Sequence, residues 1–153
     1  MSSKKVLILY YSGSGNTQKM AKAIAEAMKS GALNITTKDI GKFDISLLPN
    51  YDGIVLGSPT YFSNMAWQVK KVIDESIVHY RGGKLKGKVA GIFTSAGTSS
   101  NGKDCLKMLK IALGLHHGMK LVEGILRVDG ESDREVEKRC QEYGKRLVKE
   151  IEK

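Results

Sequence analysis

Cysteine and proline are both scarce in this chain, with two of each among 153 residues. Cys105 and Cys140 are too few for a disulfide scaffold and too far apart for a paired metal-binding motif. They indicate free thiols in a reducing compartment. So few prolines, together with 41% hydrophobic residues, exclude a collagen-like or disordered chain. The length predicts one globular domain over residues 1–153.

Long uncharged stretches are also missing. The longest, residues 53–69, contains Ser, Pro, Thr and Asn, which argues against a membrane span. The apolar run at residues 6–11 is too short for the core of a signal peptide and leads directly into glycine and serine. We therefore expect a cytoplasmic protein that has no membrane partner.

Acidic residues are few relative to basic ones. The chain has 16 Asp and Glu against 25 Lys and Arg, a formal net charge of +9. This excess favours anionic partners such as nucleotides, phosphates or acidic proteins. A nucleic-acid partner is not expected, because no basic motif is interleaved with aromatic residues.

Apolar periodicity predicts a regular alternation of strands and helices. Five strands are expected, at residues 5–10, 33–40, 53–57, 88–95 and 119–128. Amphipathic helices are expected between most of them and after the last, with one or two helical turns at residues 43–48. Because parallel strands need crossover helices, the alternation predicts an α/β, doubly wound parallel sheet with helices on both faces.

Several residues are expected to set the ends of these elements. Ser58 and Pro59 should stop the third strand, and Gly31 should end the first helix. The helix starts are expected at a cap by Asn64, at Asn101 or Gly102, and at a capping box formed by Ser132 and Glu135.

The first expected strand leads into the loop Ser12, Gly13, Ser14, Gly15, Asn16 and Thr17. Glycines let backbone N–H groups converge on an anion, the following helix adds its partial positive charge, and the hydroxyls add donors. A Walker A loop would need Ser or Thr after a Gly-Lys pair, and a dinucleotide fingerprint would need glycine where Gln18 stands. The loop therefore predicts a phosphate site built from neutral groups.

This loop resembles the FMN-phosphate loop of flavodoxins. Residues 57–66 resemble the second flavin loop of WrbA-type NAD(P)H:quinone oxidoreductases in the same superfamily, and so do residues 93–98 and 115–119. The resemblance implies a single flavodoxin-like FMN-binding domain with a five-stranded parallel sheet in the order 2-1-3-4-5. It also implies FMN, with its terminal phosphate monoester, rather than FAD or riboflavin.

Residue by residue, the resemblance places the phosphate on Ser12, Gly13, Ser14, Gly15, Asn16 and Thr17. It places the isoalloxazine ring against Pro59, Thr60, Tyr61 and Phe62, and its pyrimidine side against Ser95, Ala96, Gly97, Thr98, Ser99 and Ser100. His116 matches a flavin-contacting histidine, and Tyr80 matches an aromatic residue near the flavin of a neighbouring subunit. Alternatively, Tyr80 is a surface residue, and His116 only favours a helix C-terminus.

Two functions fit this resemblance. An enzyme would pass hydride from NAD(P)H to FMN and then two electrons to a quinone or similar acceptor. A flavodoxin would carry electrons between redox protein partners. The second and third loops favour the enzyme, whereas chain length and the first loop favour the carrier. The chain also lacks the long insertions that WrbA-type enzymes use in tetramer assembly, which leaves a homo-oligomer open.

Charge supports the enzyme, because cations near a flavin favour its anionic two-electron-reduced form. A few of six basic residues are expected to lie close to the flavin: Lys70, Lys71, Arg81, Lys84, Lys86 and Lys103.

Overall fold

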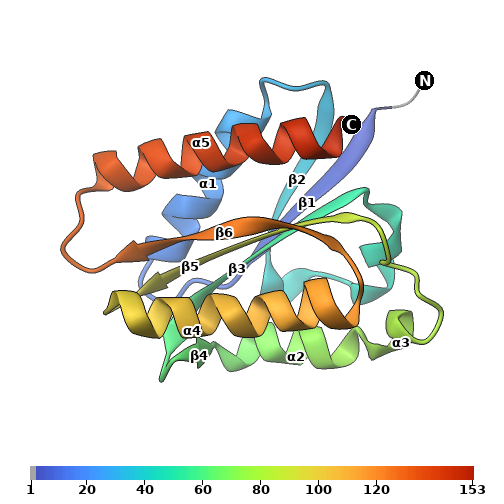
Figure 1. The fold of residues 1–153 in the computed structure, drawn as a ribbon, viewed down its shortest axis with the longest axis horizontal. Coiled ribbons are helices and arrows are strands. Elements are labelled where there is room, and N and C mark those ends of the chain that lie inside the picture. The colour runs from blue at the N-terminus through green and yellow to red at the C-terminus, as the bar shows by residue number, and fades with distance from the viewer. Residues whose placement is uncertain (1–2) are drawn as a thin grey trace.

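The computed structural model describes residues 3–153 and contains one parallel sheet between two layers of helices (Figure 1). The sheet order is β2 (Leu33–Asp39), β1 (Lys4–Tyr10), β3 (Gly53–Tyr61), β5 (Val89–Ala96) and β6 (Lys120–Val128). The two-residue strand β4 (Asn64–Met65) pairs antiparallel with the end of β3. In chain order the five parallel strands read 2-1-3-4-5, so the predicted α/β flavodoxin-like fold is confirmed.

The helices divide between the two faces of the sheet. α1 (Asn16–Met28) and α5 (Asp133–Ile151) cover one face, and α2 (Trp67–Glu75) and α4 (Ser99–Lys110) cover the other. The short helix α3 (Ile77–Tyr80) follows α2, and a π-helical segment (Ile111–His116) extends α4. The expected helical turns after β2 are two 3₁₀ segments, Ile40–Lys42 and Ile45–Asn50.

Both faces of the sheet carry an apolar core. On β1, Val6 and Ile8 pack toward α1 and α5, whereas Leu7 and Leu9 pack toward α2 and α4. All four side chains are at most 1% exposed. A central strand buried on both faces accounts for the continuous apolar run in the sequence.

The expected end of β3 at Ser58 and Pro59 is wrong, because the strand continues to Tyr61. Proline is tolerated where its missing N–H has no partner strand. The Gly57 carbonyl accepts from the Tyr11 N–H and therefore faces the β1 side of β3. Backbone groups alternate along a strand, so those of Pro59, two residues on, face the β1 side as well. The register of β1 against β3 ends at Gly57, and nothing there requires a donor from Pro59.

The expected starts of α2 and α4 are also wrong. Asn64 lies in β4, and its side chain accepts from the Met65 N–H rather than capping a helix. α2 begins at Trp67 and ends at Glu75. α4 begins at Ser99, because the Thr98 hydroxyl accepts from the Asn101 N–H at 3.3 Å.

Gly31 does not end α1, which stops three residues earlier at Met28. Its φ is not left-handed, so it is not the expected C-terminal cap. A Cβ at this position would lie 2.6 Å from Val148 Cγ1 of α5. Gly31 therefore allows close packing against the last helix.

α5 begins as predicted and lies along the middle of the sheet. The Ser132 hydroxyl accepts from the Glu135 N–H at 3.2 Å, as a capping serine does. Its buried side chains recur at helical spacing and include Val136, Cys140, Tyr143, Leu147 and Ile151. The Tyr143 hydroxyl accepts from the Ile92 N–H at 2.9 Å, at an irregularity between β5 and β6, and donates to the Val122 carbonyl.

The two ends of the described chain lie close together (Figure 1). The Lys4 ammonium donates to the Ile151 carbonyl at 2.7 Å, which joins the start of β1 to the end of α5. Both ends lie at the amino edge of the sheet, opposite the strand arrowheads. None of the helices in residues 3–153 has the length and apolar content of a membrane span.

Candidate functional site

Three loops meet at the carboxyl edge of the sheet, where ligands bind in doubly wound folds. We call them the first loop (residues 12–17), the second loop (residues 57–66) and the third loop (residues 95–100). They follow β1, β3 and β5, which are neighbours in the sheet. Contacts join the first loop to the second and to the third, and hydrogen bonds join the second loop to residues on either side of the third.

The first loop presents backbone N–H groups to an anion. Gly15 has φ +99° and precedes α1 without capping it by a side chain, and no acidic residue lies in the first helical turn. The Ser12 hydroxyl accepts from the N–H groups of Gly15 and Gln18, at 3.1 and 3.2 Å. The N–H groups of Asn16 and Thr17 remain for a ligand at the positive end of the helix dipole.

The second loop covers the first at Gly13. A Cβ at Gly13 would lie 2.4 Å from Tyr61 Oη, so only glycine leaves space for this tyrosine. Tyr61 is 46% exposed at the end of β3. The hydroxyl end of Tyr61 therefore lies against the first loop, while nearly half of the residue is open to solvent.

The third loop is joined to the first by a buried hydrogen bond. Thr17 Oγ1 and Ser95 Oγ lie 2.9 Å apart, and both residues are less than 9% exposed. This contact connects the first turn of α1 to the end of β5. It fixes the distance between the expected phosphate loop and the loop expected around the pyrimidine.

Hydroxyl and amide groups join the second loop to the residues that flank the third loop. The Thr94 hydroxyl donates to the Ser58 carbonyl at 2.6 Å, so the Thr60 hydroxyl donates to Thr94 at 2.7 Å. Farther out, the Ser63 hydroxyl donates to Asn101 Oδ1 at 2.9 Å. Thr94, Ser58 and Asn101 were not predicted as site residues from the sequence. Ser58 and Thr94 lie within the segments that resemble flavin loops, and Asn101 was expected only as a helix start.

Ser58 also shapes the second loop from inside. Its buried hydroxyl accepts from the Ala66 N–H at 2.9 Å and donates to the Pro59 carbonyl at 2.7 Å. The bond to Ala66 draws the start of α2 back toward β3. The residues between them, including Tyr61 and Phe62, form a projecting hairpin.

The tip of this hairpin is strained and apolar. Phe62 and Ser63 have φ of +51° and +65°, a conformation that non-glycine residues rarely adopt. Phe62 is fully exposed, and Trp67 at the start of α2 is 69% exposed. Strained backbone of this kind is concentrated at ligand sites, where the surrounding structure holds it. Exposed rings on a strained tip are suited to contact a planar ligand.

The structure does not bring His116 or Tyr80 to these loops. α2 and α4 run back across the sheet, so their C-terminal ends lie at its amino edge. There His116 and Tyr80 line a separate cavity of about 490 Å³ together with Ser76 and His117. Within one chain, His116 and Tyr80 therefore lie away from the three loops.

His117 forms the polar floor of that second cavity. Its Nε2 lies 2.9 Å from the Ser76 hydroxyl, and its imidazole lies nearly perpendicular to the Tyr80 ring, with the ring centroids 6.0 Å apart. Burial lowers the pKa of His117, and His79 and His116 lower it further. Its neutral imidazole is bound within the fold and is far from the three loops.

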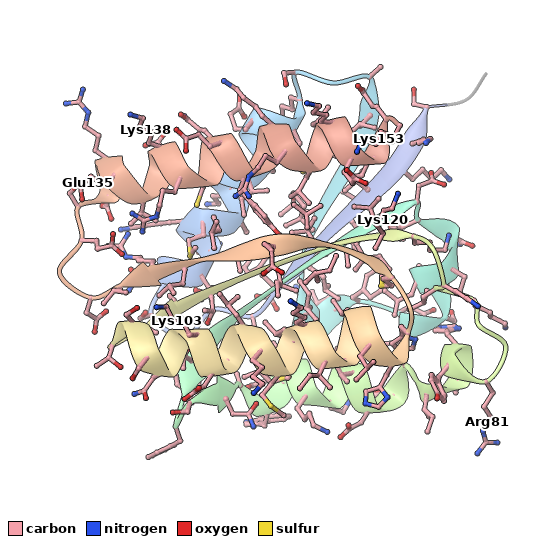
Figure 2. All side chains as sticks on the ribbon, in the orientation of Figure 1. Arg81, Lys103, Lys120, Glu135, Lys138 and Lys153 are labelled. Atoms are coloured by element: carbon pink, nitrogen blue, oxygen red, sulfur yellow. The ribbon has the colours of Figure 1, made fainter. Side chains whose placement is uncertain are left out.

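The six basic residues expected near the flavin are divided between the two edges. Arg81, Lys84 and Lys86 follow α3 at the amino edge, and Figure 2 shows Arg81 and Lys103 at opposite ends of the molecule. Lys70 and Lys71 are in α2 and form ion pairs with Asp74 and Glu75. Only Lys103, in the second turn of α4, lies near the third loop without an ion pair among the described residues.

The chain resembles known proteins over most of its length. Residues 45–132 match the family described as NADPH-dependent FMN reductase. A protein from Rhizobium meliloti named NAD(P)H dehydrogenase (quinone) 3 is 31% identical over 151 residues, covering 82% of this chain and 71% of that protein. The chain belongs to the flavodoxin-like family of FMN-dependent oxidoreductases.

Further comparisons agree with this family. A protein from Clostridium saccharobutylicum named flavodoxin is 37% identical over 127 residues, covering 82% of this chain and 73% of that protein. The crystal structure of a flavodoxin, WrbA-like protein from Agrobacterium tumefaciens has a TM-score of 0.85 and 27% identity, with 98% of each chain covered. The family assigns FMN as the cofactor.

The residues of the first loop fit the phosphate group of FMN. The following helical turn has no acidic residue, and the Ser12 hydroxyl accepts from the Gly15 and Gln18 N–H groups but not from those of Asn16 and Thr17. A Cβ at Gly15 would meet nothing within 4 Å, so the backbone there is accessible. The exposed rings beside it fit the flat faces of a flavin. The two thiols are not available for redox chemistry at this edge, because burial raises the pKa of Cys105 and brings that of Cys140 to about 12.

Proposed function

We propose that this flavodoxin-like protein is an enzyme that passes electrons from NAD(P)H through FMN to a quinone or similar acceptor. The observation that carries the proposal is the junction of the three loops, in which Tyr61 covers Gly13 and Thr17 bonds to Ser95. The relative from Rhizobium meliloti, named as a quinone dehydrogenase, supports the electron route.

In this proposal the phosphate is held by Ser12, Gly13, Ser14, Gly15, Asn16 and Thr17. The bound FMN supplies the hydride and electron chemistry. Pro59, Thr60, Tyr61 and Phe62 orient one side of its ring, and Ser95, Ala96, Gly97, Thr98, Ser99 and Ser100 surround the other. The bond between Thr60 and Thr94 holds these two walls at a fixed separation. A rigid slot for the ring limits water access and leaves one face for substrates.

His116 and Tyr80 have a role in this proposal only in an assembly of several chains. They lie at the amino edge, so a second copy would have to place that edge against the three loops. His116→Ala should then raise the KM for the acceptor, and sedimentation should show an oligomer. A monomeric protein with an unchanged KM would remove both residues from the site.

The second candidate function is a flavodoxin that carries electrons between redox protein partners. The 37% identity to the Clostridium saccharobutylicum flavodoxin favours it. So does the placement of the basic residues, because Arg81, Lys84 and Lys86 are too far from the three loops to favour two-electron reduction.

An anaerobic titration of the FMN-loaded protein with NADH and NADPH separates the two functions. For the enzyme, the nicotinamide alone bleaches the visible flavin bands, and added quinone restores them. For the carrier, the nicotinamide has no effect, and chemical reduction by one electron gives a long-lived radical spectrum. The second result would overturn the proposed enzyme.

A further inference from the structure

A cavity of about 800 Å³ lies between α4 and β6, outside the three loops. We call it the α4–β6 cavity. Its walls are mainly apolar side chains from the helix, its π-helical extension and the strands: Ile92, Leu106, Ile111, Leu115, Met119 and Leu121. The volume is in the range of small-molecule sites. Neither the proposed FMN site nor the second cavity accounts for it.

Lysines form one rim of the α4–β6 cavity. Lys103, Lys107 and Lys110 recur on one stripe of α4 and all line it, and Figure 2 shows Lys103 near the start of that helix. Lys110 Nζ lies 2.8 Å from Glu123 Oε1 on β6, so this ion pair spans the cavity from helix to strand. Lys103 and Lys107 have no carboxylate partner within residues 3–153.

Gly114 leaves space at the far end of the cavity. It lies in the π-helical segment, and a Cβ there would have only ordinary contacts, at 3.7 Å from Leu121 Cβ and 3.9 Å from Lys110 Cγ. Leu115 beside it is 72% exposed. The π-helical turn, a feature often found at functional sites, thus ends the cavity with an open apolar surface.

We propose that the α4–β6 cavity binds an amphipathic anion with a medium-length alkyl chain, such as a fatty carboxylate. The alkyl chain lies along the leucine and isoleucine walls, where its burial is favourable. The carboxylate lies at Lys103 and Lys107, two cations that lack a counter-ion in the fold. A second copy of this chain fits less well, because it would bring a protein of net charge +9 against the same lysines.

The test uses the FMN-loaded full chain titrated with decanoate and with decanol, followed by calorimetry and amide NMR. Decanoate should bind, shift the amide signals of Leu106, Gly114 and Leu121, and leave FMN bound. Decanol should bind at least about tenfold more weakly, because it lacks the charge. The double variant Lys103→Glu/Lys107→Glu should lose at least about tenfold in decanoate affinity. Lys84→Glu/Lys86→Glu, with the same change in net charge at the amino edge, should not.

Two further variants address the walls and the ion pair. Gly114→Leu should fill the cavity and abolish decanoate binding without unfolding the chain. Glu123→Gln should strengthen binding, because it removes the carboxylate that competes for Lys110. Equal affinity for decanoate and decanol, equal effects of the two double lysine variants, or release of FMN by decanoate would each overturn the proposal. So would a decanoate-sensitive dimer in sedimentation, which would identify a second copy as the occupant.

Discussion

The absence of a side chain at Gly13 allows the first and second loops to touch, because a Cβ there would lie 2.4 Å from Tyr61 Oη. Gly13→Ala should therefore push Tyr61 away and weaken FMN binding by about tenfold or more, as overpacking usually costs about 1–3 kcal/mol. FMN fluorescence quenching measures the affinity.

The matched control for Gly13 is the double variant with Tyr61→Phe. Removing Oη leaves the ring carbon Cζ at 3.7 Å from the new Cβ, an ordinary contact. The double variant should regain much of the affinity that Gly13→Ala loses. If Gly13→Ala binds FMN as tightly as the wild type, Tyr61 does not cover the phosphate loop in solution.

Ser14 gives the cleanest test of the phosphate site, because it is exposed in the first loop, whereas Thr17 is buried against Ser95. Ser14→Asp places a negative charge beside the expected phosphate and should weaken FMN binding at least about tenfold. Ser14→Asn, similar in size and uncharged, should bind more nearly like the wild type. Thermal unfolding of the FMN-free protein should be unchanged in both. Undiminished FMN affinity in Ser14→Asp would contradict the assignment.

Among the site residues, those that are consecutive in the chain could be predicted from the sequence. The loop from Ser12 to Thr17 is recognisable because its glycines and hydroxyls are consecutive in the chain. Thr94, Ser58 and Asn101 were missed because their contacts depend on the register between strands and on the start of α4. These follow only from the folded arrangement.

Among the elements, α2 and α4 decide which residues reach the three loops. Both start at the carboxyl edge and run antiparallel to the strands. His116 follows the third loop by fewer than twenty residues, roughly the number that carries a helix across a sheet. The motif around His116 resembled a flavin-contacting segment, but a motif carries no information on the edge at which it lies.

Two helical glycines, Gly144 and Gly114, allow a matched test of how closely the helices pack, because only the first is tightly packed. In α5, a Cβ at Gly144 would lie 2.8 Å from Ala27 Cβ and 2.9 Å from the Ile24 carbonyl of α1. Gly144→Ala should destabilise the protein by about 1–3 kcal/mol although alanine favours helices. Gly114→Ala, which meets nothing closer than 3.7 Å, should be neutral or stabilising by up to about 1 kcal/mol. Urea unfolding of both variants measures the difference, and similar effects would contradict close packing of α1 on α5.

The turn between β6 and α5 depends on Glu131. Its carboxylate accepts from the Arg139 guanidinium with both oxygens and from the Val128 N–H. The Arg139 hydrogen bond, then the one from Val128, lowers the pKa of Glu131 below its ordinary value of 4.5. The folded state therefore gains stability above that ordinary pKa and loses it as the pH falls through the lower folded pKa.

Glu131→Gln tests this pH dependence. The variant should be less stable than the wild type near neutral pH, and the difference should narrow as the pH falls below about 4.5. Urea unfolding at several pH values gives the comparison, with Asp129→Asn as the control in the same turn. A difference that does not change with pH would mean that Glu131 acts by packing rather than by charge.

For the molecule as a whole, the position of charge counts more than its total. The net charge of +9 suggested many cations near the flavin, but Arg81, Lys84 and Lys86 lie at the amino edge. β5 alone separates the two edges by about 23 Å, more than twice the Debye length of about 10 Å at moderate salt. Lys103, in contrast, begins about 8 Å along α4 from Thr98.

Charge reversal at the two edges should therefore affect the FMN potential differently. Lys103→Glu should lower the potential for the second electron by the equivalent of on the order of 1 kcal/mol, and less at high salt. Lys84→Glu/Lys86→Glu should leave it unchanged. Potentiometric titration of the FMN-loaded variants gives both values. Equal shifts in the two variants would show that net charge, not placement, sets the potential.

At this scale the alternation of strands and helices was enough to predict the sheet. Buried strands such as β1 and β5 read as apolar runs, and α5 shows helical spacing from Val136 to Ile151. The extension of β3 through Pro59 was not predicted, because a proline is tolerated there only once β1 has ended beside it. The distribution of charge between the edges likewise depends on topology.

The hydrogen bond from Lys4 to the Ile151 carbonyl holds the two ends of the described chain together, which matters for the design of fusion proteins. Both ends of the described chain leave the fold on the side away from the three loops. A tether or a second protein joined at either end would thus extend from the amino edge, and no linker would have to cross the mouth of the proposed flavin slot. A short peptide could also connect the two ends, and new ends could be opened in an exposed turn such as that at Gly82 and Gly83. The flavodoxin-like unit is in this sense a module with one working edge and one attachment edge.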